Sequence, residues 1–303
     1  NGKDISEDAN ENFPPEESDP FLLRHFHPPL PVYYWSVFSK LSIFGLDQER
    51  LLKISGFVAY FIFCLIFMGV LKANTQNKSI NRSQALFLIV FFTSPLLINT
   101  SLNLNFHTFH AISCIFFSYA LVNYLRSTNH KDAYVLGIAI ASLVMTLETS
   151  LILIFFGIMI ALVYQRSIFF NAQRLLKAII GMLISILILW PGTLWTGGPI
   201  KSFGMHAYRV FIEGGSEYDF SKLVLFKELL FANPLLIFLS LCIYVVMIKK
   251  CFQDLTIFVP LSLGLSLLIF IGNFAHFQSY FLPAITLIAL GATSALEKRQ
   301  YEK

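Results

Sequence analysis

The sequence is poor in charged residues and in cysteine. Only 13% of its 303 residues are Asp, Glu, Lys or Arg, about half the share found in ordinary globular proteins. This scarcity excludes soluble enzymes and nucleic-acid-binding proteins. The few cysteines lie in or beside apolar runs and lack metal-ligand spacing, which excludes a secreted disulfide scaffold. We interpret them as small apolar side chains that fill the core. They are Cys64, Cys114, Cys242 and Cys251.

Apolar side chains are abundant instead. Hydrophobic residues make up 56% of the chain, phenylalanine fills 32 positions, and the mean hydropathy is +0.66. Nine runs are long enough, some only with their flanks, to form helices that cross about 30 Å of hydrocarbon. The chain is therefore predicted to be an all-α polytopic membrane protein. The runs are Ile54–Leu71, Ala85–Ile98, Phe109–Leu125, Ala133–Leu147, Thr149–Tyr164, Ala178–Leu194, Leu229–Ile248, Leu255–Gly272 and Ala275–Leu296.

The distribution of basic residues predicts the orientation. If all nine runs cross and alternate, the short connections Asn99–Thr108, Glu148 and Asn273–Ala275 carry no Lys or Arg. The basic residues near the membrane collect on the other side, which the positive-inside rule makes cytoplasmic. Joining the fourth and fifth runs would spoil this pattern. The residues on the basic side are Lys72, Lys78, Arg82, Arg126, Lys131, Arg166, Arg174, Lys177, Lys249, Lys250, Lys298, Arg299 and Lys303.

This topology divides the chain into five parts. Residues 1–53 form an outer loop, 54–194 the first six spans, 195–228 a second outer loop, 229–296 the last three spans, and 297–303 a cytoplasmic tail. Because the predicted outer N-terminus shows neither an initiator Met nor a signal peptide, we expect a further transmembrane helix before Asn1.

The first outer loop begins with an acidic stretch that contains Asp4, Glu7 and Asp8. Such a stretch is either a solvated tail or a source of carboxylates that act as a base or bind a divalent cation. Three prolines between 28 and 31 are expected to prevent a helix and to set an extended turn. Val32–Leu46 follows with Tyr and Trp beside a polar stripe, which predicts a helix in the headgroup layer that ends near Gly45.

The second outer loop has the same character. Ser202, His206, Arg209 and Glu213 share one helical face, so an interfacial helix is predicted. Its cations either bind an anion or extend toward water from an apolar surface. Six of the seven histidines map to the outer side, which favours a polar cavity there: His25, His27, His107, His110, His206 and His276. Glu148 is either a functional carboxylate at membrane depth or a hairpin tip.

Several motifs resemble one enzyme family. His27-Pro28-Pro29-Leu30, then Tyr33-Tyr34-Trp35, then Ile43-Phe44-Gly45 are similar to the HPPL–YY–LFG signature of GT-C-fold membrane glycosyltransferases of the dolichyl-phosphate-mannose mannosyltransferase-like group, which includes the lipid-A aminoarabinose transferases. Thr93–Leu96 resembles the TSPL motif of this group, and Tyr280–Pro283 resembles its C-terminal motif. The sequence departs from the pattern in the reversed acidic pair Glu7-Asp8 and in a Glu, Glu148, where many members carry a lysine.

The resemblance implies a GT-C-like bundle of about nine transmembrane helices in the bacterial plasma membrane. It implies an inverting transfer of a sugar from a polyprenyl-phosphate donor to a hydroxyl of a glycan, lipid or protein acceptor on the outer face. Asp8, with Glu7 and Asp4 as further candidates, would be the general base. No cofactor is identified, although a divalent cation is compatible with the carboxylates. The implied substrate-binding residues are Arg24, His27, Pro28, Tyr34, His107, Glu148, Lys201, His206, Arg209, His276 and Tyr280.

Three other functions are consistent with the same features. Glu148 and the prolines Pro191, Pro260 and Pro283, which can interrupt helices, would suit a transporter or channel. The large outer loop would also suit a lipid-linked glycan polymerase or ligase, and the altered motifs would suit an inactive scaffold. The membrane lipid is a partner in every case, and nucleic acid is a partner in none.

Overall fold

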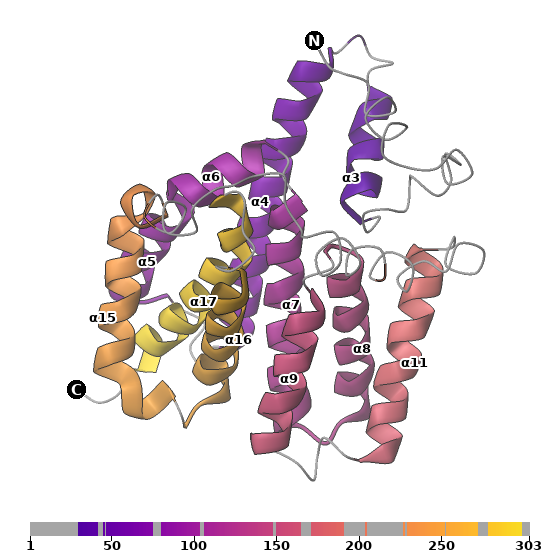
Figure 1. Cartoon of the computed structure of the whole chain (residues 1–303), viewed down its shortest axis with the longest axis vertical. Helices are drawn as coiled ribbons and strands as arrows, with labels where there is room; N and C mark the ends of the chain where they lie inside the picture. The colour runs from indigo at the N-terminus through magenta and orange to yellow at the C-terminus, as the bar shows by residue number, and fades with distance from the viewer. Residues whose placement is uncertain are drawn as a thin grey trace.

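The computed structural model describes residues 30–41, 45, 47–74, 80–103, 106–147, 150–164, 171–190, 204, 227, 229–251, 253–271 and 278–298. All regular structure in these residues is helical (Figure 1). The elements are α3 (Leu30–Ser39), α4 (Gln48–Asn74), α5 (Arg82–Phe92), α6 (Pro95–Leu102), α7 (Phe106–Arg126), α8 (His130–Val144), α9 (Ser150–Tyr164), α11 (Ala172–Leu189), α15 (Pro234–Cys251), α16 (Leu255–Ile271), the 3₁₀ helix η3 (Gln278–Phe281) and α17 (Leu282–Lys298).

Over the described residues, each predicted apolar run overlaps one helix or a bent pair of helices. Four segments are long and apolar enough to cross a membrane on their own: α4, α7, α11 and η3 with α17. The bent pair α5 and α6 would be a fifth, and α9, α15 and α16 are shorter apolar helices. The described residues thus confirm an all-helical chain with four or five candidate membrane-spanning segments, while nine crossings remain a prediction.

Proline explains two differences from the expected helices. The run Ala85–Ile98 was expected to be continuous, but α5 and α6 meet at an angle of 49°. Pro95 is the first residue of α6, and a proline disfavours the helical conformation in the residue before it, so Ser94 is extended with ψ of 135°. The expectation that the prolines prevent a helix is wrong for Pro31, which lies in the first turn of α3, where backbone N–H groups have no helical acceptor.

The predicted headgroup-layer helix is present but shorter than Val32–Leu46. It ends as α3 at Ser39 and is followed by a short 3₁₀ turn at residues 40 and 41. Gly45 has a φ of +80°, in the left-handed region that glycine adopts without the steric cost of a side chain. The prediction that the helix ends near Gly45 is therefore wrong, because α3 already ends at Ser39.

Hydrogen bonds between helix ends show which of these ends lie together. At one end the Asn81 amide, just before α5, donates to the Leu296 carbonyl of α17, and Arg174 of α11 donates to the carbonyl of Tyr124 in α7. We name this the cationic end because it carries Arg82, Arg126, Lys131, Arg174 and Lys177 at the adjoining helix ends. The opposite end, where α7 begins and α8 ends, is the histidine end.

Helices α7 and α17 are the most buried of the long apolar segments, and α11 lies at one edge of the bundle (Figure 1). In the most apolar window of α7, 78% of residues are buried, against 28% in α11. Phe57, Phe61 and Leu65 repeat every four residues along α4 and remain exposed. An exposed apolar helix face of this kind is typical of contact with lipid.

Helices α8 and α11 approach each other closely through glycines. A side chain on Gly137 of α8 would collide with the carbonyl oxygen of Ala178 and lie 2.7 Å from the backbone nitrogen of Met182 in α11. A Cβ atom on Gly181 of α11 would likewise lie 2.9 Å from the carbonyl oxygen of Tyr134. Small residues that allow backbone contact are the usual means of helix association in membranes.

Candidate functional site

The helix formed from the HPPL–YY segment is attached to the histidine end of the bundle. The backbone N–H of Leu30, the first residue of α3, donates to the carbonyl of Met145 at the end of α8, over 3.1 Å. The Tyr34 hydroxyl donates to the Ser55 carbonyl of α4 over 2.6 Å. The Tyr34 ring also packs on Phe109 of α7, with ring centroids 4.8 Å apart. Helix α3 therefore joins three helices at this end.

Partial burial of the Tyr34 side chain affects the ionisation of its hydroxyl. Partial removal from water raises the pKa of Tyr34 to about 12, because the phenolate loses more hydration than the neutral phenol. The same effect raises the pKa of Tyr33. The Tyr34 hydroxyl consequently keeps the proton that it donates to Ser55 at every physiological pH.

His107 and Tyr280 meet at the histidine end although they come from distant parts of the chain. His107 lies in the first turn of α7 and is buried, and Tyr280 lies in η3, directly before α17. Their ring centroids are 4.2 Å apart with an interplanar angle of 48°. Tyr34 contacts Phe109, two residues beyond His107, so the three described residues of the predicted site gather around one turn of α7.

A buried polar group lies one turn further along α7. His110 is fully buried, and its Nε2 atom lies 3.3 Å from the Ser150 hydroxyl oxygen. The Ser150 hydroxyl donates its one hydrogen to the Leu143 carbonyl over 2.6 Å, so His110 Nε2 must be the donor in their contact. The other ring nitrogen, Nδ1, is buried and has no hydrogen-bond partner in the described part of the chain.

Further hydroxyl groups extend this buried polar layer. Ser113 of α7 and Ser142 of α8 are 2.7 Å apart, and the Thr108 hydroxyl donates to Ser101 over 3.4 Å. The sequence-based site omitted His110 and Ser150. The available signal was the i, i+3 spacing of His107 and His110, which places both on one face of a helix. Within the described ranges no group of three or more His, Cys, Asp or Glu side chains could hold a metal ion.

Most of the predicted site lies outside the described residues. This applies to the proposed bases Asp4, Glu7 and Asp8, and to the following predicted binding residues: Arg24, His27, Pro28, Glu148, Lys201, His206, Arg209 and His276. The predicted interfacial helix around His206 is outside them as well. The positions of these side chains relative to His107 remain predictions.

A separate apolar cavity lies between α7, α8, α9 and α11, and none of the predicted site residues lines it. Comparison of the chain with protein-family models, curated proteins and solved structures gives no match. The sequence motifs and the geometry of the histidine end are therefore the features that bear on function.

Proposed function

We propose that the chain is a membrane glycosyltransferase that transfers a sugar from a polyprenyl-phosphate donor to an acceptor hydroxyl on the outer face of a bacterial plasma membrane. One observation carries the proposal. The helix α3, which begins within the HPPL–YY motif, is attached to the end of the bundle at which His107 and Tyr280 meet.

This arrangement suits a donor of mixed character. A polyprenyl phosphate keeps its hydrocarbon tail in the bilayer and its phosphate at the headgroup level, so the reaction belongs where a surface helix covers the end of a membrane bundle. Tyr34 and Trp35 of α3 are side-chain types that favour the membrane interface. The buried hydroxyl and imidazole groups below them supply hydrogen-bonding partners for a sugar at a depth where lipid supplies none.

The chemistry assigned to the site is an inverting displacement at the anomeric carbon. A carboxylate, Asp8 with Glu7 or Asp4 as alternatives, accepts the proton of the acceptor hydroxyl while its oxygen bonds to the anomeric carbon. The bond from that carbon to the phosphate oxygen breaks, and the phosphate leaves with the electron pair. The cations Arg24, Lys201 and Arg209 would offset the charge on the departing phosphate. His107 and Tyr280 would contact the sugar.

Transfer of a labelled sugar tests the proposal. Membranes that contain the chain are incubated with polyprenyl phosphates carrying radiolabelled mannose or aminoarabinose, and label in the acceptor fraction is measured. The Asp8→Asn variant should lose about 100-fold or more of the transfer rate, the usual contribution of a general base. Glu17→Gln, in the same acidic segment, is the matched control and should retain activity. Full transfer by Asp8→Asn, Glu7→Gln and Asp4→Asn alike would refute the base assignment.

A transporter is the second candidate, favoured by one feature. The pair α5 and α6 is bent by 49° at Ser94-Pro95, and interrupted helices form substrate sites in many transporters. Proteoliposomes that contain the chain separate the two functions. Accumulation of a solute without release of polyprenyl phosphate would support transport, whereas release of polyprenyl phosphate with no accumulation would support transfer.

A further inference from the structure

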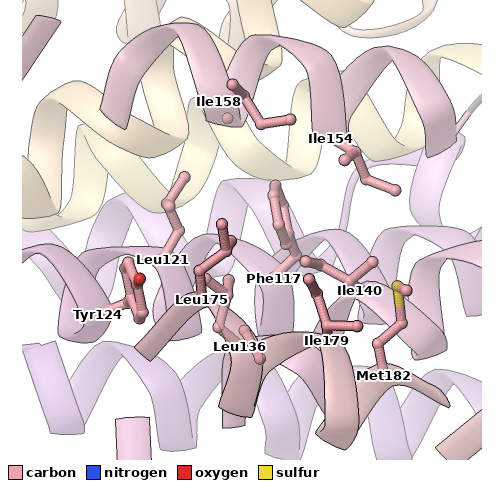
Figure 2. A pocket seen from close by; sticks show the side chains of 12 residues that line it. Phe117, Leu121, Tyr124, Leu136, Ile140, Ile154, Ile158, Leu175, Ile179 and Met182 are labelled. Atoms are coloured by element: carbon pink, nitrogen blue, oxygen red, sulfur yellow. The ribbon is translucent and has the colours of Figure 1, made fainter. Parts of the chain in front are cut away.

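The cavity between α7, α8, α9 and α11 has a volume of about 110 Å³. Figure 2 shows Leu121 and Phe117 of α7, Leu136 of α8, Ile158 of α9 and Ile179 of α11 around it. Apart from Tyr124, all of its lining residues are apolar. A cavity of about 150 Å³ with similar walls binds benzene, so this one is large enough for several methylene groups of a hydrocarbon chain.

The cavity is accessible from the lipid. It lies where α9 and α11 flank α8, and the side chains at its rim, Ile158 and Ile179, are 40% and 41% exposed. Its lining residues on α7 come from the C-terminal half of that helix, and those on α11 from the N-terminal part. The cavity thus extends from the middle of the bundle toward the cationic end, away from the proposed transfer site.

A buried cation lies at that end of the cavity. The guanidinium carbon of Arg174 is 4.0 Å from the ring centroid of Tyr124, whose side chain lines the cavity. Arg174 is only 2% exposed. Its Nη2 atom donates to the Tyr124 carbonyl over 2.8 Å, but Nε and Nη1 are buried and have no hydrogen-bond partner in the described part of the chain.

This cation lacks a counter-charge among the side chains that the structure describes. No carboxylate of the described residues forms an ion pair with Arg174. Leaving buried guanidinium N–H groups without acceptors is costly. Two further features favour an anion at this place. Arg174 lies in the first turn of α11, where the helix dipole is positive, and Lys177 follows one turn later, half-buried.

We propose that the cavity and Arg174 form a binding site for an anionic glycerophospholipid of the leaflet at the cationic end. One acyl chain occupies the cavity, and a phosphate oxygen accepts hydrogen bonds from the Arg174 nitrogens. Because Nε and Nη1 are covered, binding includes a shift of a side chain at the cavity end. The apolar walls supply the affinity for the chain, and the guanidinium supplies the preference for a negative headgroup. The site goes beyond the proposed transfer reaction and does not depend on it.

Lipid titration of the purified chain tests the role of Arg174. The chain in a neutral detergent is titrated with dioleoyl phosphatidylglycerol or dioleoyl phosphatidylcholine, and bound lipid is counted by native mass spectrometry. Phosphatidylglycerol should bind more tightly than phosphatidylcholine. Arg174→Gln should weaken phosphatidylglycerol binding about tenfold, the effect of losing a charge-assisted hydrogen bond, and leave phosphatidylcholine binding unchanged. Lys131→Gln, which removes an exposed cation at the same end, should change neither affinity.

A second pair of variants tests the cavity without touching the charge. Ile158→Trp fills the opening and should abolish retention of phosphatidylglycerol. Val163→Trp, on the same helix but 78% exposed and outside the cavity, should bind as the wild type does. This pair tests the cavity even if Arg174→Gln fails to fold. Equal binding of the two lipids by the wild type, wild-type binding by Arg174→Gln, or wild-type binding by Ile158→Trp would each overturn it.

Discussion

The imidazole ring of His107 packs against the phenol ring of Tyr280, with centroids 4.2 Å apart, at the end of the bundle to which α3 is attached. This contact ties the start of α7 to η3 and so to the start of α17. It joins two residues of the predicted substrate site that lie far apart in the sequence. The interaction energy between the two rings can be measured.

Double-mutant analysis should reveal coupling between the two rings. His107→Leu and Tyr280→Leu should each lower the thermal unfolding temperature in detergent, and the double variant should cost less than the sum of the two. An aromatic pair contributes about 0.5–1.5 kcal/mol beyond its buried area. Tyr280→Phe keeps the ring and is the matched control. Strict additivity of the two leucine variants would contradict the contact.

The titration of Tyr34 should be displaced to high pH. Burial raises its pKa from 10 to about 12, so the stabilisation by its neutral form is complete below pH 10 and is lost as the pH rises through 12. The difference in phenolate absorbance between the wild type and Tyr34→Phe isolates this residue. Its midpoint should lie near 12, and a midpoint near 10 would indicate that α3 is not attached to α4.

The helices could be predicted from hydropathy because a backbone in hydrocarbon has few ways to satisfy its hydrogen bonds. Every N–H and C=O group in hydrocarbon must find an internal partner, so an apolar run becomes a helix, as Ile54–Leu71 did within α4. The break at Ser94-Pro95 was missed because proline contributes to an apolar run by composition while it interrupts the backbone. The start of α3 was predicted too late because proline was expected to prevent a helix. Pro31 lies in the first turn, where a backbone N–H has no helical acceptor and its absence costs no hydrogen bond.

The candidate site was predictable only in part. The expected orientation placed His107 and Tyr280 on one face of the membrane, but nothing in the sequence paired them, because their contact depends on how α7 and α17 pack. The bond between His110 and Ser150 depends in the same way on α7 and α9. Arg174 was counted as a cation of the basic side, and its burial against Tyr124 became apparent only from the packing of α11 on α7 and α8.

Gly137 should be far less tolerant of substitution than Gly69. An alanine at 137 would collide with the Ala178 carbonyl oxygen and force α8 away from α11, at a cost of about 1–3 kcal/mol. An alanine at 69 meets no atom of the described chain within 4 Å, and alanine's higher helix propensity should leave stability unchanged or raise it by up to about 1 kcal/mol. Thermal unfolding of the two variants in detergent compares them, and equal effects would contradict the close helix contact.

The predicted orientation can be tested with two engineered cysteines in a variant whose native cysteines are replaced by serine. Asn103 follows α6 toward the histidine end, and Thr128 lies between α7 and α8 at the cationic end; both are exposed. A maleimide that does not cross membranes should label Asn103→Cys in intact cells. It should label Thr128→Cys only after permeabilisation, because the basic end is expected to face the cytoplasm. The reverse labelling pattern would invert the topology and move the proposed site to the inner face.

Asp254 should contribute more to stability than its ion-pair partner Arg126. The Oδ1 atom of Asp254 lies 2.6 Å from Arg126 Nη2 and also accepts hydrogen bonds from the backbone N–H and the hydroxyl of Thr256 at the start of α16. Arg126→Met removes only the ion pair, and because this arginine is 42% exposed the loss should be about 1 kcal/mol or less. Asp254→Ala removes the pair together with a helix cap that is typically worth about 1 kcal/mol.

Asp254→Asn keeps an oxygen acceptor for Thr256 and loses the charge, so its unfolding temperature should lie between those of the wild type and Asp254→Ala. Equal losses of unfolding temperature in Arg126→Met and Asp254→Ala would contradict the prediction. They would mean that Asp254 stabilises the protein through its ion pair with Arg126, which joins α7 to α16, and not through the cap of α16.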